Sequence, residues 1–170
     1  PAHAPRHGHL KVAAAMHAAT LVLNAGSSSL KFSLFTQGAH GPELIQRGQL
    51  DGLTTTSRFD AKSAAGAALG HRQWDHALGH DGALEHIVAF MRDQLTGQSL
   101  AGVGHRVVHG GMKHAKPLRL DAAVLADLAQ FNSLAPLHQP HNLTPIRLML
   151  ERRPDLPQVA CFDTAFHRAQ

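Results

Sequence analysis

The sequence predicts an α/β domain in which a central sheet is flanked by helices. Residues 21–35 hold two short apolar segments around a polar, Ser-rich loop, which is the pattern of a β-hairpin. Residues 81–95 and 121–131 carry apolar side chains at helical spacing. Residues 158–162 form a short apolar run that is typical of a buried strand.

Length and composition are those of a folded domain. The 170 residues are 44% hydrophobic, enough to bury the core of one domain or a little more. The net charge is +4, but the basic residues are scattered without interleaved aromatics, so nucleic acid is not an expected partner and an anionic substrate explains the sign equally well. The single cysteine, Cys161, excludes an internal disulfide and is expected to be a small buried residue in a reducing compartment.

Residues 1–20 are expected to be a flexible extension in front of a domain that covers residues 21–170. The extension is rich in Ala, His and Pro and has no clear period. Two basic residues precede an apolar run at 12–16, as in a signal peptide, but the run is short and His17 interrupts it. A cytoplasmic location without a membrane partner is therefore expected.

The loop of the first hairpin has residue types that can bind phosphate. Gly26 lets the backbone come close to a ligand, the serine hydroxyls and successive N–H groups can converge on phosphate oxygens, and Lys31 supplies a positive charge. An ordinary Ser-rich turn is the alternative. A Walker A loop is excluded, because it requires a Lys directly after its second Gly and a helix after the loop.

The next segments are mainly structural. Residues 43–50 read as a third strand, polar enough to be an edge strand, and residues 51–79 as loops with short strands. The helix over residues 81–95 has Asp81 as its expected N-cap.

Residues 102–111 alternate in a way that predicts a strand with Arg106 and Val108 on one face. A guanidinium fork beside an aliphatic side chain suits a small carboxylate with a short alkyl tail. The alternative is an edge strand with a surface Arg. The HGG that follows also occurs in esterases, but these need a downstream GxSxG, and the nearest approach, at 97–101, lies upstream and lacks the last Gly. A hydrolase is therefore excluded.

The last third of the chain holds two polar side chains at places suited to a site. After the helix over residues 121–131, which Asp121 is expected to cap, a loop at 135–142 is stiffened by two prolines and would aim His138. A further helix should run from about residue 143. Asp163 ends the predicted strand at the edge of the sheet where ligands bind, and is a reasonable Mg²⁺ ligand there.

Four motifs in this order resemble the N-terminal half of the acetate kinases and of the closely similar propionate kinases. They are NAGSSSLKFSLF at 24–35, GHRVVHGG at 104–111, APLHQPHNL at 135–143 and CFDTAFH at 161–167. The resemblance implies an actin/hexokinase-like (ribonuclease H-like) fold with a mixed central sheet flanked by helices. It also implies reversible, Mg²⁺-dependent transfer of the ATP γ-phosphoryl group to acetate, giving acetyl phosphate and ADP, in a full-length protein that is a homodimer.

The resemblance implies roles for residues at matching positions. Arg106 would hold the carboxylate and the transferring phosphoryl group, His138 would hydrogen-bond that group in the transition state, and Asp163 would organise Mg²⁺ or the attacking carboxylate. Val108 and Leu137 would line the pocket for the methyl group. The residues on the phosphate or nucleotide side would be Asn24, Ser27, Ser29 and Lys31, with Asn24 also near the metal.

Three departures from the family pattern accompany the resemblance. Gln139 stands where the family usually has Asn, and Met112 and Lys113 follow HGG where an acidic residue is common. The sequence given also ends at Gln170, whereas the family continues into a second, nucleotide-binding domain. The isolated chain is therefore expected to be inactive. The alternatives are a truncated module that binds a carboxylate or phosphate without catalysis, and a metal-binding protein, since the chain has 15 histidines.

Overall fold

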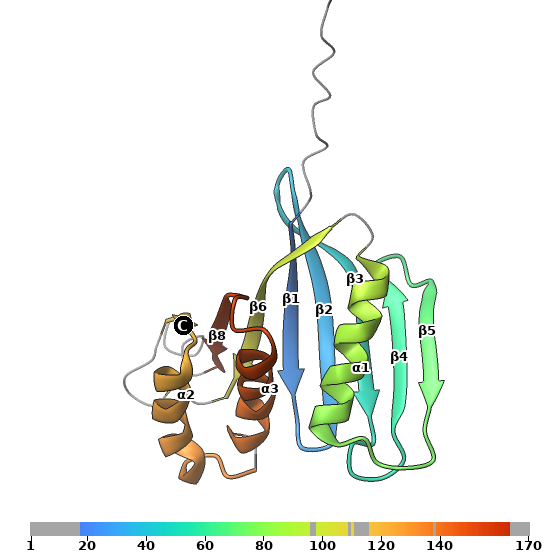
Figure 1. Ribbon diagram of the computed structural model, residues 1–170. Helices are drawn as coiled ribbons and strands as arrows, with labels where there is room; N and C mark the ends of the chain where they lie inside the picture. Colours follow the sequence, from blue (N-terminus) through green and yellow to red (C-terminus); the bar gives the residue numbers. More distant parts are fainter. Residues whose placement is uncertain (1–17, 96–97, 109, 111–115, 138, 164–170) are drawn as a thin grey trace, which may run out of the picture.

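The computed structural model describes residues 18–95, 98–108, 110, 116–137 and 139–163. Within them, eight strands form one mixed sheet in the order β5-β4-β3-β2-β1-β6-β8-β7 (Figure 1). The strands are β1 (Ala18–Ala25), β2 (Ser29–Gly38), β3 (Gly41–Asp51), β4 (Arg58–Ser63), β5 (Ala68–Gln73), β6 (Ser99–Val107), β7 (Leu118–Arg119) and β8 (Gln158–Phe162). The helices are α1 (Gly79–Gln94), α2 (Ala122–Ala129), the 3₁₀-helix η1 (Gln130–Ser133) and α3 (Gln139–Arg152).

Strand direction brings the carboxyl ends of three strands to the same end of the sheet. β1 to β5 form an antiparallel meander, and the predicted hairpin of β1 and β2 is confirmed by its register, Leu23 opposite Phe32. β6 pairs with β1 in parallel, and β8 pairs with β6 in parallel. The carboxyl ends of these strands, at Ala25, Val107 and Phe162, therefore lie at the same end of the sheet. Open α/β sheets bind ligands at this end.

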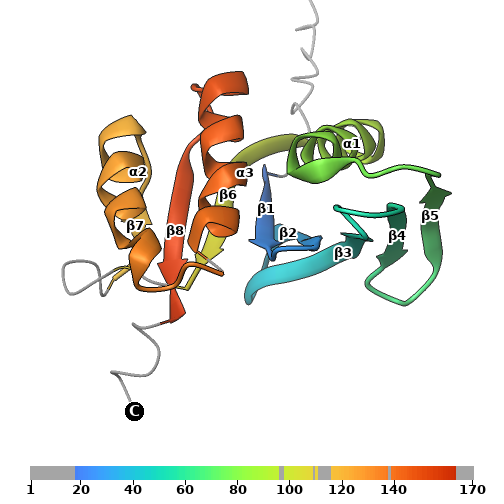
Figure 2. The ribbon, with the colours of Figure 1, turned by 90° about the horizontal axis from the view of Figure 1, so that it is seen from below.

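The three α-helices lie on one face of the sheet (Figure 2). Leu84, Ile87 and Met91 on α1, spaced by three or four residues, are buried against the meander, as the sequence predicts. Ile146 and Met149 on α3 are buried as well. Burial of an aliphatic side chain contributes about 1.5–3 kcal/mol, so these contacts hold the helices on the sheet. The opposite face is covered by no helix of the described part of the chain.

Two predicted strand properties are wrong. The segment expected as an edge strand is β3, which lies between β2 and β4 with hydrogen-bonded neighbours on both sides. Gln46, which makes it look polar, is buried and donates to the Met91 sulfur at 3.2 Å. Cys161 is exposed, because alternation along β8 places Ala160 and Phe162 under the helices and Cys161 on the uncovered face.

Three element boundaries also differ from the sequence prediction. β1 begins at Ala18, inside the expected extension, while residues 1–17 lie outside the described part. α1 begins at Gly79, so Asp81 lies in its first turn and Leu78 is the N-cap residue. α3 begins at Gln139, inside the expected loop, because a proline in the first turn of a helix loses no intrahelical hydrogen bond.

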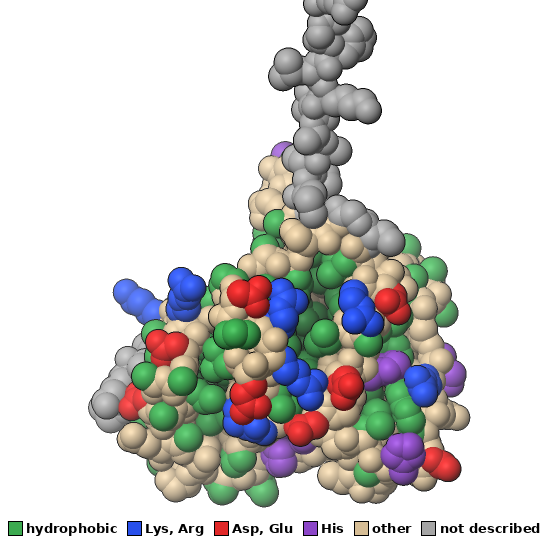
Figure 3. Space-filling view, in the orientation of Figure 1, with side chains coloured by type: hydrophobic (Ala, Val, Ile, Leu, Met, Phe, Trp, Pro, Cys, Tyr) green, Lys and Arg blue, Asp and Glu red, His purple; other side chains and the backbone are tan. Residues whose placement is uncertain are grey.

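The expected N-cap of the second helix agrees with the structure. Asp121 caps α2, since its side chain accepts a hydrogen bond from the Val124 amide at 2.8 Å. On the face that carries the helices, acidic and basic side chains are intermixed (Figure 3). In the described part of the chain, no helix is both long and apolar enough to cross a membrane.

Candidate active site

A cleft of about 420 Å³ opens where β1, β6 and β8 end. The β1–β2 hairpin supplies one wall, and the ends of β6 and β8 supply the other, with α3 behind them. The lining residues are Asn24, Ala25, Gly26, Ser29, Lys31, Arg106, Val108, Asn142 and Asp163. The cleft thus joins segments that are far apart in the sequence, because parallel pairing aligns their strand ends.

The Ser-rich loop on the first wall is held by short hydrogen bonds. The Gly26 amide donates to the Ser29 carbonyl at 2.8 Å, which closes the turn between β1 and β2. The Gly26 carbonyl accepts from Nε2 of His80 at 2.7 Å, so this ring nitrogen carries the proton. The His80 ring, in the first turn of α1, stacks on His141 of α3 with centroids 5.2 Å apart. The loop is therefore tied to both helices behind it.

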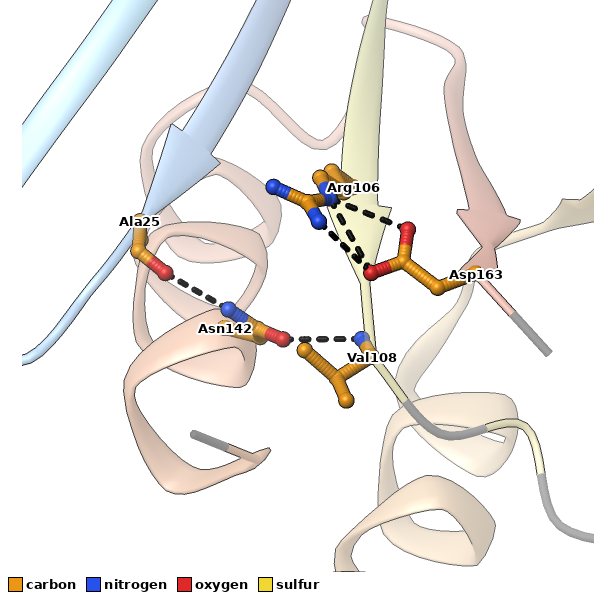
Figure 4. A network of polar contacts seen from close by, with 5 residues as sticks. All are labelled: Ala25, Arg106, Val108, Asn142 and Asp163. Carbon is orange, nitrogen blue, oxygen red and sulfur yellow. Dashed lines mark hydrogen bonds and ion pairs between the residues drawn. The ribbon is translucent and has the colours of Figure 1, made fainter. Parts of the chain in front are cut away.

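Arg106 and Asp163 form a two-point ion pair on the other wall (Figure 4). Nε of Arg106 donates to Oδ1 and Oδ2 of Asp163 at 2.9 and 3.1 Å, and Nη2 donates to Oδ2 at 2.8 Å. The hydrogen bonds that Arg106 donates to the Asp163 carboxylate, and then the charge of that carboxylate, raise the pKa of Arg106 above its usual value. Both side chains are partly exposed, at 55% and 32%, so the pair faces the cleft and can exchange partners with a ligand.

The ion pair uses only one edge of the guanidinium. Asp163 accepts from Nε and Nη2, and no hydrogen bond or ion pair among the described residues involves Nη1 of Arg106. A guanidinium has five N–H donors, so the second edge, formed by Nη1 and the remaining hydrogen of Nη2, can bind a carboxylate or phosphate at two points. Lys31 adds a second cation to the cleft. With one carboxylate against two cations, the cleft suits an anion.

Asn142 connects the two walls from behind. This side chain is 4% exposed and lies in the first turn of α3. Its Nδ2 donates to the Ala25 carbonyl at 2.6 Å, and its Oδ1 accepts from the Val108 amide at 2.9 Å. Ala25 ends β1 and Val108 follows β6, so one side chain links the two strand ends.

The structure brings most of the predicted site residues together. Those that line the cleft are Asn24, Ser29, Lys31, Arg106, Val108 and Asp163. Ser27 is exposed in the hairpin loop and does not line the cleft, and Leu137 is 73% exposed and does not line it either. His138 lies outside the described residues.

Sequence reasoning missed Asn142 and His80. Asn142 falls within the third motif, residues 135–143, where the two prolines predict a loop that aims His138. Asn142 lies two positions after a proline, which is compatible with the first turn of a helix. Only the fold shows which groups its side chain contacts. His80 carries no local signal, because its partner, Gly26, is 54 residues away in the chain.

The oxygen donors available to a cation in the cleft are few. Asp163 supplies the carboxylate, and Asn24 supplies an amide oxygen at the end of β1. Hard cations prefer such ligands. Within the described residues no group of three or more His, Cys, Asp or Glu side chains is placed to hold a metal by itself, so a cation would need ligands from a substrate or from water.

Comparison with known proteins points to one family. Residues 19–170 match the family model described as the acetokinase family. The chain is 49% identical over 154 residues to the acetate kinase of Rhizobium meliloti, covering 88% of this chain and 38% of that protein. It is 47% identical over 151 residues to the acetate kinase of Nitrobacter hamburgensis, covering 87% and 37%. The chain thus spans less than two fifths of the length of these relatives.

Solved structures agree with this result. A propionate kinase from Francisella tularensis superposes with a TM-score of 0.79 at 31% identity, over 90% of this chain and 38% of that one. An acetate kinase from Porphyromonas gingivalis gives a TM-score of 0.76 at 32% identity, over 88% and 38%. The mixed sheet with helices packed on it agrees with the actin/hexokinase-like fold that the sequence resemblance implies.

Proposed function

The chain belongs to the acetokinase family, and from this premise we propose that it is the N-terminal domain of an acetate kinase. The domain covers residues 21–170 together with the start of β1, and a second, nucleotide-binding domain accounts for the greater part of the relatives' length. The reaction is the reversible transfer of the ATP γ-phosphoryl group to acetate, which gives acetyl phosphate and ADP. The observation that carries this proposal is the Arg106–Asp163 pair in the cleft beside Lys31.

Arg106 binds the acceptor in this proposal. The acetate carboxylate, or the phosphoryl group in flight, takes the guanidinium edge that Asp163 leaves open, while Val108 contacts the methyl group. One carboxylate oxygen of acetate forms a bond to the γ-phosphorus as the bond from that phosphorus to the β,γ-bridging oxygen breaks, and ADP leaves with the electron pair. Acetate is already ionised at neutral pH, so no general base is required.

The hairpin wall neutralises the phosphates. Lys31 and Ser29 line the cleft on the hairpin wall, and Asn24, which pairs with Lys31 across the hairpin, lines it as well. Phosphoryl transfer needs little covalent help from a protein, so catalysis depends on position and on charge neutralisation. Contributions of Ser27, His138 and Leu137, which the family resemblance implies, remain part of the proposal.

Mg²⁺ fits this cleft only together with the nucleotide. Asp163 and Asn24 would supply oxygen ligands, and phosphate oxygens and water would complete the shell, as is usual for Mg²⁺. When bound, the ion neutralises charge on the phosphates. A cytoplasmic location and a homodimeric full-length enzyme belong to the same proposal and rest on the family resemblance.

A propionate kinase is the second candidate. The structure of a propionate kinase superposes on 90% of this chain. The two substrates differ by one methylene, which a hydrophobic pocket distinguishes by about 1–3 kcal/mol. Val108 is the side chain of the described cleft that is placed to make this distinction.

A chimera tests the proposal directly. Residues 18–170 are joined to the remaining C-terminal part of the Rhizobium meliloti acetate kinase, whose matching segment is 49% identical. We expect the chimera, with Mg²⁺ and ATP, to form acetyl phosphate from acetate, and the 170-residue chain alone to form none, because ATP is not positioned without the second domain. An Asp163→Asn chimera is the negative control.

Two results would contradict the proposal. A chimera that is folded by circular dichroism, yet inactive toward both acetate and propionate, would exclude the kinase function of this cleft. Turnover by the 170-residue chain alone that disappears in its Asp163→Asn variant would show that the nucleotide site lies within this chain.

A further inference from the structure

Asn142 occupies the point where the parallel pairing of β1 and β6 stops. The last registered pair of these strands is Leu23 with His105. Beyond it, Ala25 and Val108 are not joined by the ladder, and the two walls of the cleft separate. Asn142 fills this position with one side chain that bonds to both backbones (Figure 4).

We propose that Asn142 is a positioning residue that sets the distance between the phosphate-side wall and the carboxylate-side wall of the cleft. The inference rests on the proposed function, in that the reacting groups are held by these two walls. Asn142 replaces the hydrogen bonds that the sheet gives up where it opens to form the cleft.

The chemistry of the two backbone groups requires an amide at this position. The Ala25 carbonyl can only accept a hydrogen bond, and the Val108 amide can only donate one. The side chain between them must therefore donate with one atom and accept with the other, which Asn does and an ionised Asp or a Leu does not. Because Asn142 is 4% exposed, water has little access to replace either bond.

Each of the two backbone groups that Asn142 binds is close in the chain to residues that hold a reactant in the proposed function. Ala25 follows Asn24 and precedes Gly26 on the phosphate side. Val108 lines the cleft itself and is two residues from Arg106. In-line transfer requires the acceptor oxygen and the phosphorus to be held close and aligned, and a displacement of about 1 Å can cost about 100-fold in rate. Both polar atoms of the Asn142 side chain bind main-chain groups, so Asn142 does not contact the reactants through them. It would affect the rate of phosphoryl transfer by setting the positions of the Ala25 and Val108 backbones.

The test uses two Asn142 variants of the chimera and a matched control. Asn142→Leu removes both bonds, and we expect kcat to fall about 10- to 100-fold with the KM values for acetate and ATP nearly unchanged. Gln46→Leu is the control, because Gln46 is also a buried amide, at 2% exposure, but bonds to Met91 between β3 and α1, away from the cleft. Its kcat should stay at the wild-type value.

Asn142→Asp gives a readout that a purely structural role would not produce. The ionised carboxylate cannot donate to the Ala25 carbonyl, whereas the protonated carboxyl can donate to it and still accept from Val108. The kcat of Asn142→Asp relative to the unsubstituted chimera should therefore rise as the pH is lowered from 8 toward 6. Hydrogen exchange on the 170-residue chain provides a measurement without activity: the Val108 amide is protected, and Asn142→Leu removes the protection.

Failure of the inference is distinct from failure of the proposed function. If the unsubstituted chimera is active and both Asn142 variants keep its kcat, Asn142 does not position the walls. The same conclusion follows if Gln46→Leu lowers kcat as much as Asn142→Leu does, or if the Val108 amide exchanges equally fast in the chain with and without the substitution.

Discussion

Arg106 and Asp163 lie at the carboxyl ends of two neighbouring parallel strands, and Asp163 holds the guanidinium of Arg106 by its Nε and Nη2 atoms. This contact orients the guanidinium and leaves its other edge, formed by Nη1 and the remaining hydrogen of Nη2, without a hydrogen bond to any described residue. In the proposed function the two residues act as one unit: Asp163 orients Arg106, and Arg106 holds the Asp163 carboxylate until a substrate or cation competes for it.

Arg106→Lys in the chimera should lower kcat/KM about 100- to 1,000-fold, about 3–4 kcal/mol of transition-state stabilisation. Lysine keeps the charge but has no planar fork, so it cannot bond Asp163 and an anion at two points each. Steady-state kinetics in both directions measures the effect. Arg47→Lys, on the exposed side of β3 and outside the cleft, is the matched control. A loss of less than about tenfold in Arg106→Lys, about 1.4 kcal/mol, would show that the fork is not used.

Val108→Ala should shift the preference of the chimera from acetate toward propionate. Val108 lines the cleft beside Arg106, and its truncation makes room for one more methylene, which is worth about 1–3 kcal/mol. Competition between the two acids measures the ratio of their kcat/KM values. If the ratio does not move while the variant remains folded, Val108 does not contact the alkyl group.

The free energy of unfolding of the 170-residue chain should decrease as the pH is lowered, because His105 titrates. Burial lowers the pKa of His105 to about 4, with a smaller opposing effect of its hydrogen bond to Gln158. In the unfolded chain the pKa of this group is near 6.5. The unfolded state therefore binds more protons between pH 6.5 and 4, and the free energy of unfolding is greatest above pH 6.5 and falls as the pH is lowered.

The expected slope is about 1.4 kcal/mol per pH unit, or roughly 3 kcal/mol over this window. Urea unfolding at several pH values measures it. His105→Gln keeps a donor for Gln158 but does not titrate, so the difference in slope between the two proteins isolates His105. Equal slopes in the two proteins would mean that His105 is not held neutral by the fold.

Gly48→Ala should destabilise the fold by about 1–3 kcal/mol, because the core has no room for the added methyl group. A Cβ at this position would lie 2.6 Å from the Asp60 carbonyl oxygen and 2.6 Å from Cε1 of Phe32. Gly104→Ala is the control, since its Cβ would meet only Val22 Cγ2, at 3.8 Å. Urea midpoints measure both variants. A Gly48→Ala protein as stable as Gly104→Ala would contradict the close packing of Phe32 on β3.

Local patterns in the sequence predicted the elements well where the signal is short-range. The hairpin of β1 and β2, the apolar stripe of α1, the Asp121 cap of α2 and the strand β8 follow from residues that are neighbours in the chain. That Lys31, Arg106 and Asp163 belong to one site was implied by the resemblance to the acetate kinases, and all three line the cleft. The charge and hydrogen-bonding capacity of these side chains follow from the residue type, which the sequence gives directly.

The tertiary structure decided what depends on distant partners. β3 lies inside the sheet because β4 pairs with it, and Cys161 is exposed because the helices cover the other face of β8. Asn142 bonds to Ala25, 117 residues away, and no local pattern can indicate such a contact. The sequence by itself determined which groups are present and which segments are helix or strand, since these depend on spacing along the chain. The fold alone decided which backbone atoms remain unpaired where the sheet opens, and therefore which side chain must satisfy them.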